Sequence, residues 1–414
     1  MKWPRRPGFL LLAAALSYAS LSCDDDGAVL DPNADPDAAL RAQISLPDGF
    51  KIHVYADGLI RPRSLALGDS GTVFAGTYFF TPGATSPVYA LRDEDGDNRV
   101  DVIIEIRNSF NSPNGVDYHA GTLFISDEDR VFRIDDVEAN LLNPNPVLLY
   151  DGLPSRVETD SATRVGHFWR PLRYGPDDKI YIGVGTRWSF LVGAHTANDL
   201  NDDWRYSTIV RMNPDGSGVE VYANGVRNSM GMDFHPETGD LYFTDNGPSW
   251  PFDDPRFYDI PPDELNRAPA PGMDFGFPYI HGRLPDPLIG GAAPAGLIPP
   301  AHEFEGHTAP LGMRFYTGDM FPEEYHNAIF VAEHGTEATT PTTSRSQVSG
   351  DRISVIKLGA DGMPASYEVF ADGFLTGTNA TYTRRPVDLL VLPDGSLLVS
   401  DDEEWVIYRI YYEP

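Results

Sequence analysis

The chain of 414 residues is poor in cysteine and in basic side chains, and both shortages exclude classes of protein. Cys23 is the single cysteine, so no disulfide can form within the chain and no CxxCH motif can attach haem. Lys and Arg number 31 against 61 Asp and Glu, which gives a formal net charge of −30 at pH 7. Because this charge repels phosphate backbones, we expect no nucleic acid as a partner.

Several short catalytic motifs are also missing from the sequence. There is no GxSxG nucleophile elbow, no GxxxxGK phosphate loop and no GxGxxG after an expected strand. Serine hydrolase, P-loop and Rossmann assignments therefore lack support. Sustained helical periodicity is scarce past residue 45, where alternating apolar residues are interrupted by Asp-Gly, Asn-Gly and Pro-Asp turns. The composition therefore favours an all-β protein.

The first residues have the pattern of an export signal. Residues 1–23 combine a basic start with an apolar run from Phe9 to Ala19 that is too short to span a bilayer comfortably. The triplet "LSC" is similar to the end of a bacterial lipoprotein signal, in which the cysteine becomes the lipidated first residue. We expect export to the periplasm or cell surface and a membrane anchor on Cys23, with release as a free secreted protein as the alternative. Residues 24–45 are acidic and rich in Pro and Ala, which predicts a flexible tether before a folded domain at 46–414.

A loose module recurs along the folded part of the chain. It consists of a polar residue, an apolar strand, a polar turn and a second apolar strand. Its six copies span residues 63–76, 114–126, 170–185, 230–245, 311–333 and 385–400. Six such copies predict a six-bladed β-propeller, with each blade a four-stranded sheet around a central channel.

The residues before each module should converge, because the innermost strands of a propeller all begin at one face of the channel. Several of them are cationic or amide side chains, which suit an anionic, planar, carboxylated ligand. These residues are Arg61 or Arg63, Asn114, His167 with Arg170, Arg227 with Asn228, Pro310 and Arg385.

Five segments between residue 166 and the C-terminus carry a family resemblance. They are "GHFWRPLRYGPDDKIYIGVG", "NGVRNSMGMDFHPETGDLYFTDNGP", "PPDELN", "APLGMRFYTGDMFPEEYHNAIFVAEHG" and "RRPVDLLVLPDGSLLVSDDEEWVIYRIYY". In this order they resemble the glucose/sorbosone dehydrogenases, six-bladed propellers that bind pyrroloquinoline quinone (PQQ) and oxidise sugars. "GVRN" and "PDGSLLVSDD" are similar to the sorbosone-type branch in particular.

The resemblance implies roles for individual residues. His167 is similar to the catalytic base of the family, and Arg227 and Asn228 to the pair that contacts the quinone oxygens. Arg385 is similar to an arginine that binds a cofactor carboxylate. Gly247 and Pro248 stand where the family offers backbone carbonyls to calcium, a cation that prefers oxygen ligands.

One segment departs from the family pattern. The sorbosone-type branch reads His-Gly-Ser-Trp-Asn-Arg where this chain reads "EHGTEATTPTTSR". The tryptophan of this motif is therefore absent, and Arg345 is the arginine that would make the cofactor contact in its place.

The implied activity is a PQQ- and calcium-dependent oxidation of the C1 hydroxyl of a sugar to a lactone. His167 would take the hydroxyl proton, while Arg227 and calcium stabilise negative charge on the quinone oxygen. Electrons would pass to an external acceptor, a cytochrome or a quinone. Two alternatives stay open: a calcium-dependent lactonase with a similar propeller, and a non-catalytic binding propeller at the cell surface.

A second calcium site is expected near the start of the domain. The stretch "DEDGDNRVD" places Asp93, Asp95, Asp97 and Asp101 at relative positions one, three, five and nine. A short loop with this spacing can wrap oxygen atoms around calcium, although Gly96 comes earlier than in an EF-hand and the final glutamate is missing. A solvated acidic turn is the alternative. We expect a structural site that braces the first blade.

Overall fold

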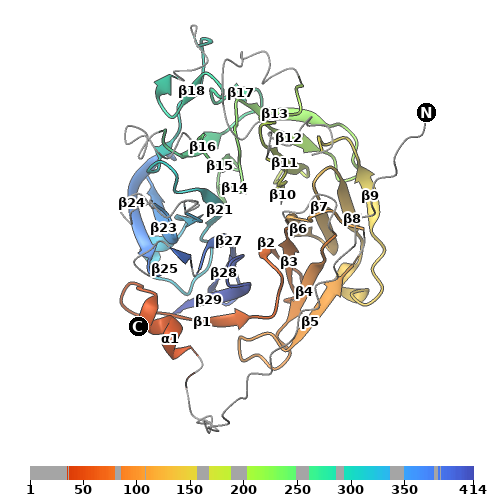
Figure 1. The fold of residues 1–414 in the computed structure, drawn as a ribbon, viewed down its shortest axis with the longest axis vertical. Helices are drawn as coiled ribbons and strands as arrows, with labels where there is room; N and C mark the ends of the chain where they lie inside the picture. The colour runs from red at the N-terminus through yellow and green to blue at the C-terminus, as the bar shows by residue number, and fades with distance from the viewer. Residues whose placement is uncertain are drawn as a thin grey trace, which may run out of the picture. The chain divides into compact units, whose positions relative to one another are not determined.

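Six sheets follow one another around a common axis in the computed structural model (Figure 1), and all their strand pairs are antiparallel except β13 with β17 in the third. The folded unit is Asp37–Pro414, and the chain's other unit, Met1–Pro36, is described only at Asp35. The structure describes residues 35, 37–79, 85–107, 109–155, 167–187, 203–248, 261–285, 293–335, 349–376, 381–382 and 384–414. Cys23 and the expected export signal lie outside these ranges. The architecture confirms the predicted six-bladed β-propeller.

Each blade starts with the strand nearest the axis and runs outward. Blade one contains β2 (Pro62–Leu67), β3 (Val73–Thr77), β4 (Val88–Arg92) and β5 (Val102–Ile106). Blade two contains β6 (Gly115–His119), β7 (Thr122–Ser126), β8 (Val131–Ile134) and β9 (Val147–Tyr150). Blade three contains β10 (Leu172–Tyr174), β11 (Ile180–Val184), β12 (Thr208–Met212) and β13 (Glu220–Asn224), with β17 (Met273–Asp274) as a fifth strand. Blade four contains β14 (Met232–Phe234), β15 (Leu241–Asp245), β16 (Glu264–Ala268) and β20 (His302–Glu303). Blade five contains β21 (Pro310–Phe315), β22 (Ile329–Glu333), β23 (Arg352–Leu358) and β24 (Pro364–Ala371). The six predicted modules all include the two innermost strands of a blade.

The sixth blade joins the two ends of the folded unit. It contains β27 (Pro386–Val391), β28 (Leu397–Asp401) and β29 (Val406–Tyr412), and its outer strand is β1 (Phe50–Ala56) from the start of the domain. β1 pairs antiparallel with β29, so that Phe50 lies opposite Tyr412 and Ile52 opposite Ile410. This pairing closes the ring, because the first strand completes the last blade (Figure 1).

Apolar clusters fill the space between neighbouring blades. The central strands are buried on both faces, as β3, β11, β15, β22 and β28 show with every residue buried. Six clusters of buried side chains lie one at each boundary between blades, and the boundary of blades four and five contains Tyr242, Met313 and Val331. Blades therefore stack face to face, and the β-branched and aromatic residues of these strands supply the buried area.

The first helix occupies part of the expected tether. α1 (Ala38–Gln43) carries Leu40, which with Ile44 packs into the cluster around Phe50. Leu40 and Ile44 lie one helical turn apart and are each only 5% exposed, because this face of the turn packs on the sixth blade. The folded unit thus begins at Asp37, before the expected residue 46.

The remaining described elements are short. They are the 3₁₀ helices η1 (Val137–Ala139) and η4 (Glu323–Tyr325) and the strand pairs β18 (Ile280–His281) with β19 (Leu284–Pro285) and β25 (Leu375–Thr376) with β26 (Thr381–Tyr382). Within the described ranges, no helix has the length and apolar character needed to cross a membrane.

Three aspartates near the axis tie alternate blades to the next one. Each carboxylate comes from the innermost strand of blade two, four or six and accepts a backbone N–H from the innermost strand of the following blade. The pairs are Asp117 with Tyr174 at 2.7 Å, Asp233 with Phe315 at 3.0 Å and Asp388 with Leu65 at 2.8 Å.

Two buried arginines supply positive charge to this group of aspartates. Arg173 lies 3.3 Å from Asp117 and 3.9 Å from Asp233, and Arg314 lies 3.4 Å from Asp388. Burial raises the pKa of Asp233 and of Asp388 to about 6, while the charge of Arg173 opposes the shift in both. Both aspartates are therefore mainly ionised at pH 7, although burial penalises their charge.

Removing Asp388 should destabilise the ring where the chain ends meet. We expect Asp388→Ala to lower the free energy of unfolding by about 3 kcal/mol, because the Leu65 N–H and Arg314 lose a buried acceptor. Denaturant unfolding at pH 7 measures the change. Asp319→Ala, at an exposed site, should change stability by less than about 0.5 kcal/mol; equal losses in the two variants would contradict the assigned role.

Candidate active site

The predicted site residues come from the segments that enter blades three, four and six. His167 precedes β10, Arg227 and Asn228 precede β14, and Arg385 precedes β27. These innermost strands run in the same direction along the axis, so the segments before them meet at one end of it. Arg63, rather than Arg61, has its side chain buried among this set, where it donates to Asn114 at 3.1 Å.

His167 is held by its backbone next to the segment of Arg227. Its N–H donates to the carbonyl of Thr186 at 3.1 Å, and the Thr186 N–H donates to the carbonyl of Arg227 at 2.7 Å. The imidazole Nε2 is buried and has no hydrogen-bond partner among the described residues. Burial lowers the pKa of His167 well below 6.5, and the charges of Arg227 and Arg170 lower it further. His167 is therefore neutral at pH 7 and able to accept a proton.

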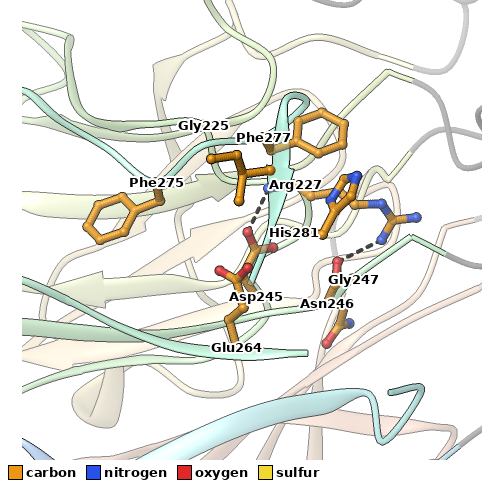
Figure 2. A pocket seen from close by; sticks show the side chains of 10 residues that line it. Gly225, Arg227, Asp245, Asn246, Gly247, Glu264, Phe275, Phe277 and His281 are labelled. Atoms are coloured by element: carbon orange, nitrogen blue, oxygen red, sulfur yellow. Dashed lines mark hydrogen bonds between the residues drawn. The ribbon is translucent and has the colours of Figure 1, made fainter. Parts of the chain in front are cut away.

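Asp245 fixes the backbone of the Arg227–Asn228 pair. Its two carboxylate oxygens accept the N–H groups of Arg227 at 2.8 Å and Asn228 at 2.5 Å. Arg227 Nη1 donates to the carbonyl of Asn246 at 2.8 Å, and Figure 2 draws both contacts of Arg227. Burial lowers the pKa of Arg227 to about 10, against the charges of Asp245 and Asp263. The guanidinium thus stays charged at pH 7.

A glycine separates His167 from Asn228. A Cβ on Gly185 would lie 2.5 Å from the Cβ of His167 and 3.0 Å from Oδ1 of Asn228, so a side chain there would displace one of them. Asn228 Oδ1 is itself buried without a hydrogen-bond partner in the described part of the chain. Two side chains that each carry a buried polar atom without a partner, His167 and Asn228, therefore lie close to Gly185, an arrangement that suits a polar ligand.

A small pocket opens beside Arg227 (Figure 2). One side is polar and the other is apolar, with aromatic rings from the segment after β17. Its lining residues are Gly225, Arg227, Asp245, Asn246, Gly247, Glu264, Phe275, Phe277, Ile280 and His281.

Gly247 and Pro248, the predicted calcium ligands, follow β15 at this pocket. The N–H of Gly247 donates to Asp263 at 2.6 Å, and the other oxygen of Asp263 accepts the N–H of Ala309 at 2.8 Å. Within the described ranges, the carbonyl oxygens of Gly247 and Pro248 accept no hydrogen bond. The peptide is thus oriented by its donor while its oxygens stay available.

The buried acids behind these two residues were not predicted from the sequence. Burial raises the pKa of Asp245 to about 7, and burial together with the charge of Asp245 raises the pKa of Glu264 to about 8. Burial also raises the pKa of Asp263. "PPDELN" contains Asp263 and Glu264, but no local pattern indicates that they lie beside Asp245.

Arg385 has a different neighbourhood from the one expected of a carboxylate-binding arginine. Its Nε donates to the carbonyl of His334 at 3.0 Å and its Nη2 to that of Gly335 at 2.7 Å. The guanidinium therefore braces the turn after β22, and its contact with a ligand stays a prediction. Arg345 lies outside the described residues.

The predicted aspartate loop connects β4 to β5 in the first blade. Asp93, Asp95 and Asp101 each place one carboxylate oxygen within 4.8 Å of the others. Asp97 is not in this group, and its carboxylate accepts the N–H of Arg99 at 2.8 Å. The structure thus brings together three of the four predicted ligands.

Fold and geometry together define a class: a six-bladed propeller with a histidine, an arginine and an asparagine gathered at one end of its axis. A family model described as glucose / sorbosone dehydrogenase matches residues 155–353. That range includes His167, Arg227, Asn228, Gly247 and Pro248, so the match supports the family that the sequence resembles.

Individual proteins are similar to this chain in sequence or in structure. An uncharacterised protein of Borreliella burgdorferi is 28% identical over 387 residues, 90% of this chain and 92% of that protein. Aldose sugar dehydrogenase YliI of Escherichia coli is 24% identical over 163 residues, 36% of this chain and 40% of that protein. The holo form of the pyranose dehydrogenase PQQ domain from Coprinopsis cinerea has a TM-score of 0.68 at 17% identity, covering 89% of this chain and 97% of that chain. This last likeness shows a shared fold.

Proposed function

We propose that the protein is a PQQ- and calcium-dependent sugar dehydrogenase, which oxidises the C1 hydroxyl of a sugar to a lactone and passes electrons to an external cytochrome or quinone. One observation carries the proposal: the buried Nε2 of His167 and Oδ1 of Asn228 have no partners in the described part of the chain and lie beside the charged Arg227. The family match covers all three residues. "GVRN" and "PDGSLLVSDD" favour the sorbosone-type branch.

The residues present fit both cofactors. Arg227 offers a buried positive charge to an anionic, planar quinone, and Asn228 Oδ1 can accept a hydrogen bond from an N–H or hydroxyl group of a ligand. The carbonyls of Gly247 and Pro248 would hold calcium in front of the buried acids Asp245 and Asp263. Oxygen ligands and nearby negative charge are what a hard divalent cation requires.

The protein's own groups account for the movement of the proton. When bound, the quinone supplies an electrophilic carbon that accepts a hydride. His167 Nε2 is neutral and takes the proton of the C1 hydroxyl, so the C1–O bond becomes a carbonyl as the C1 hydride leaves. Arg227 stabilises the negative charge that develops nearby. The links through Thr186 hold His167 and Arg227 at a fixed separation.

We further propose that the aspartate loop binds a structural calcium ion through Asp93, Asp95 and Asp101. Their convergence supports this proposal. These carboxylates lie in the loop between β4 and β5, and a cation bound there would offset the repulsion between them.

Reconstitution tests the proposed activity directly. With PQQ and calcium added to purified protein, aldoses should reduce an artificial electron-accepting dye, and His167→Ala should lower kcat about 10²- to 10⁴-fold because the base is lost. Quinone affinity, followed by absorbance, should stay nearly unchanged. His326→Ala, at an exposed histidine on the turn after η4, is the matched control and should keep full activity.

Other outcomes of this assay point to the other functions. Acidification of a lactone solution with calcium alone, without dye reduction, would indicate the lactonase. Retention of a glycan or protein with both assays silent would indicate the binding propeller. Absence of both dye reduction and quinone binding would refute the dehydrogenase.

The pH profile tests the state of His167. Because burial and the charges of Arg227 and Arg170 lower its pKa, His167 is neutral above pH 6.5 and loses its proton-accepting form only at a lower pH. We therefore expect protonation of His167 to lower kcat/KM only well below pH 6.5. A half-maximal point at or above pH 6.5 would show that the base is not this buried histidine.

Calcium should stabilise the first blade through the aspartate loop. At a calcium concentration about 100 times its dissociation constant, ligation contributes about 2.7 kcal/mol, which corresponds to a rise in Tm of a few degrees. Asp95→Asn should lose part of this rise while keeping the acceptor for the Asp97 N–H. Asp361→Asn changes a similar turn, in which Asp361 accepts the Met363 N–H, and should keep the full rise; equal calcium responses in both variants would exclude the loop as a site.

A further inference from the structure

A second group of buried donors lies next to His167 and is not used by the proposed reaction. Arg63 is only 2% exposed. Its Nε donates to Asn114 Oδ1 at 3.1 Å and its Nη1 to Asp402 Oδ2 at 2.5 Å. Its Nη2 is buried and has no hydrogen-bond partner in the described ranges. Two of the three guanidinium nitrogens, Nε and Nη1, thus hold the group in place, and the third, Nη2, lacks an acceptor.

Two aromatic rings pack side by side against the same guanidinium. The Arg63 carbon Cζ lies 5.2 Å from the ring centroid of Trp169 and 5.8 Å from that of Tyr78. The two rings meet edge to face, with centroids 5.1 Å apart. Since cation–π and edge-to-face contacts both favour one orientation, the position of Nη2 is set before any ligand arrives.

Trp169 adds a second donor without an acceptor. Its Nε1 is buried and has no hydrogen-bond partner among the described residues. The ring centroid of Trp169 lies 6.3 Å from that of His167, the proposed base. Leaving two buried donors without acceptors is costly, which indicates that a ligand supplies the acceptors.

The charge of this group decides what kind of ligand it suits. Asp402 neutralises Arg63, and His334 Nε2 lies 2.9 Å from the other oxygen of Asp402. Burial lowers the pKa of His334 to about 4, so its imidazole is neutral at pH 7 and donates to Asp402. Arg63, Asp402 and His334 together therefore have no net charge, and Arg63 presents its donor beside aromatic rings. Neutral hydroxyl groups on a carbon ring match both features.

We propose that Arg63 and Trp169 form the subsite that positions the sugar, with Arg63 Nη2 and Trp169 Nε1 donating hydrogen bonds to two of its hydroxyl oxygens. This inference rests on the proposed dehydrogenase function and assigns substrate binding within the same site. Asp402, Asn114 and Tyr78 are positioning residues, because they act through Arg63. The subsite directs the C1 hydroxyl of the sugar toward the neighbouring His167.

Conservative variants separate sugar binding from cofactor binding. The probe is whichever of D-glucose, D-galactose, D-xylose and L-arabinose the reconstituted wild type oxidises fastest. Trp169→Phe keeps an aromatic ring and removes the donor, so KM should rise about threefold to tenfold. Arg63→Lys keeps the charge opposite Asp402 and loses the fork of donors, so KM should rise about tenfold to a hundredfold. Quinone affinity should change less than twofold in both.

Matched controls exclude general effects of these substitutions. Arg267 also pairs with an aspartate, Asp240, and lies over an aromatic ring, Tyr242, but at the outside of blade four, so Arg267→Lys should leave KM unchanged. Trp405→Phe, at a partly exposed turn after β28, controls for loss of an indole. Thermal unfolding of each variant shows whether it is folded.

Sugars that lack one hydroxyl give the sharpest test. In the wild type, one monodeoxy form of the probe should have a KM about threefold to tenfold higher than that of the parent sugar, because Trp169 Nε1 loses its acceptor. In Trp169→Phe the same monodeoxy sugar should raise KM no further, since the interaction is already gone. Equal penalties in wild type and variant, or variants that weaken quinone binding and leave KM unchanged, would overturn the inference. A wild type that neither binds quinone nor reduces dye would instead refute the proposed function.

Discussion

β1 and β29, from the two ends of the folded unit, pair with each other, and without this pairing the ring of blades stays open. The pairing completes the sixth blade with the first strand of the domain, so the ring can close only when both chain ends are in place. Asp388 adds a buried link from the sixth blade to Leu65 of the first. Every inner strand then has a neighbour on both sides, and the segments that precede these strands are brought to one end of the axis. A site assembled from several blades has a defined geometry only after this closure.

Backbone donors, rather than side-chain donors, fix most of the candidate site. Asp245 accepts two successive N–H groups at Arg227 and Asn228, and Asp263 orients the peptide of Gly247. The functional atoms are thereby left without protein partners while the main chain around them is rigid. Burial raises the pKa of both acids, so this rigidity is obtained at an electrostatic cost. Such a site is pre-organised for an anionic group beside Arg227 and for a cation beside the buried acids.

The sequence predicted the fold well because the signals for inner hairpins are local. Alternating apolar residues and turns such as Pro-Asp-Gly, where Gly395 adopts a φ of +85°, identify each hairpin by itself. The same repeat also predicted that the residues before each module converge, and Arg63 and Asn114 do lie in contact. Contacts between residues far apart in the sequence could not be predicted in this way. Within blade four, this applies to the acids behind Gly247. Between blades five and six, it applies to the Asp402–His334 pair and to the use of Arg385 to hold a turn. α1 was missed because six residues give too short a periodic pattern.

The ties between blades also reveal an internal symmetry. At the boundaries where an axial aspartate links an even blade to the next, a hydroxyl on the second strand of the even blade donates to a backbone carbonyl of that next blade. These hydroxyl contacts are Ser126 to Arg170 at 2.5 Å, Thr244 to Leu311 at 2.8 Å and Ser400 to Arg63 at 2.7 Å. The repeating unit is therefore a pair of blades, present three times, rather than a single blade. His167 and Arg227 belong to different pairs, so the candidate site lies at a junction between repeats, where a residue can diverge without disturbing the contacts that build each unit.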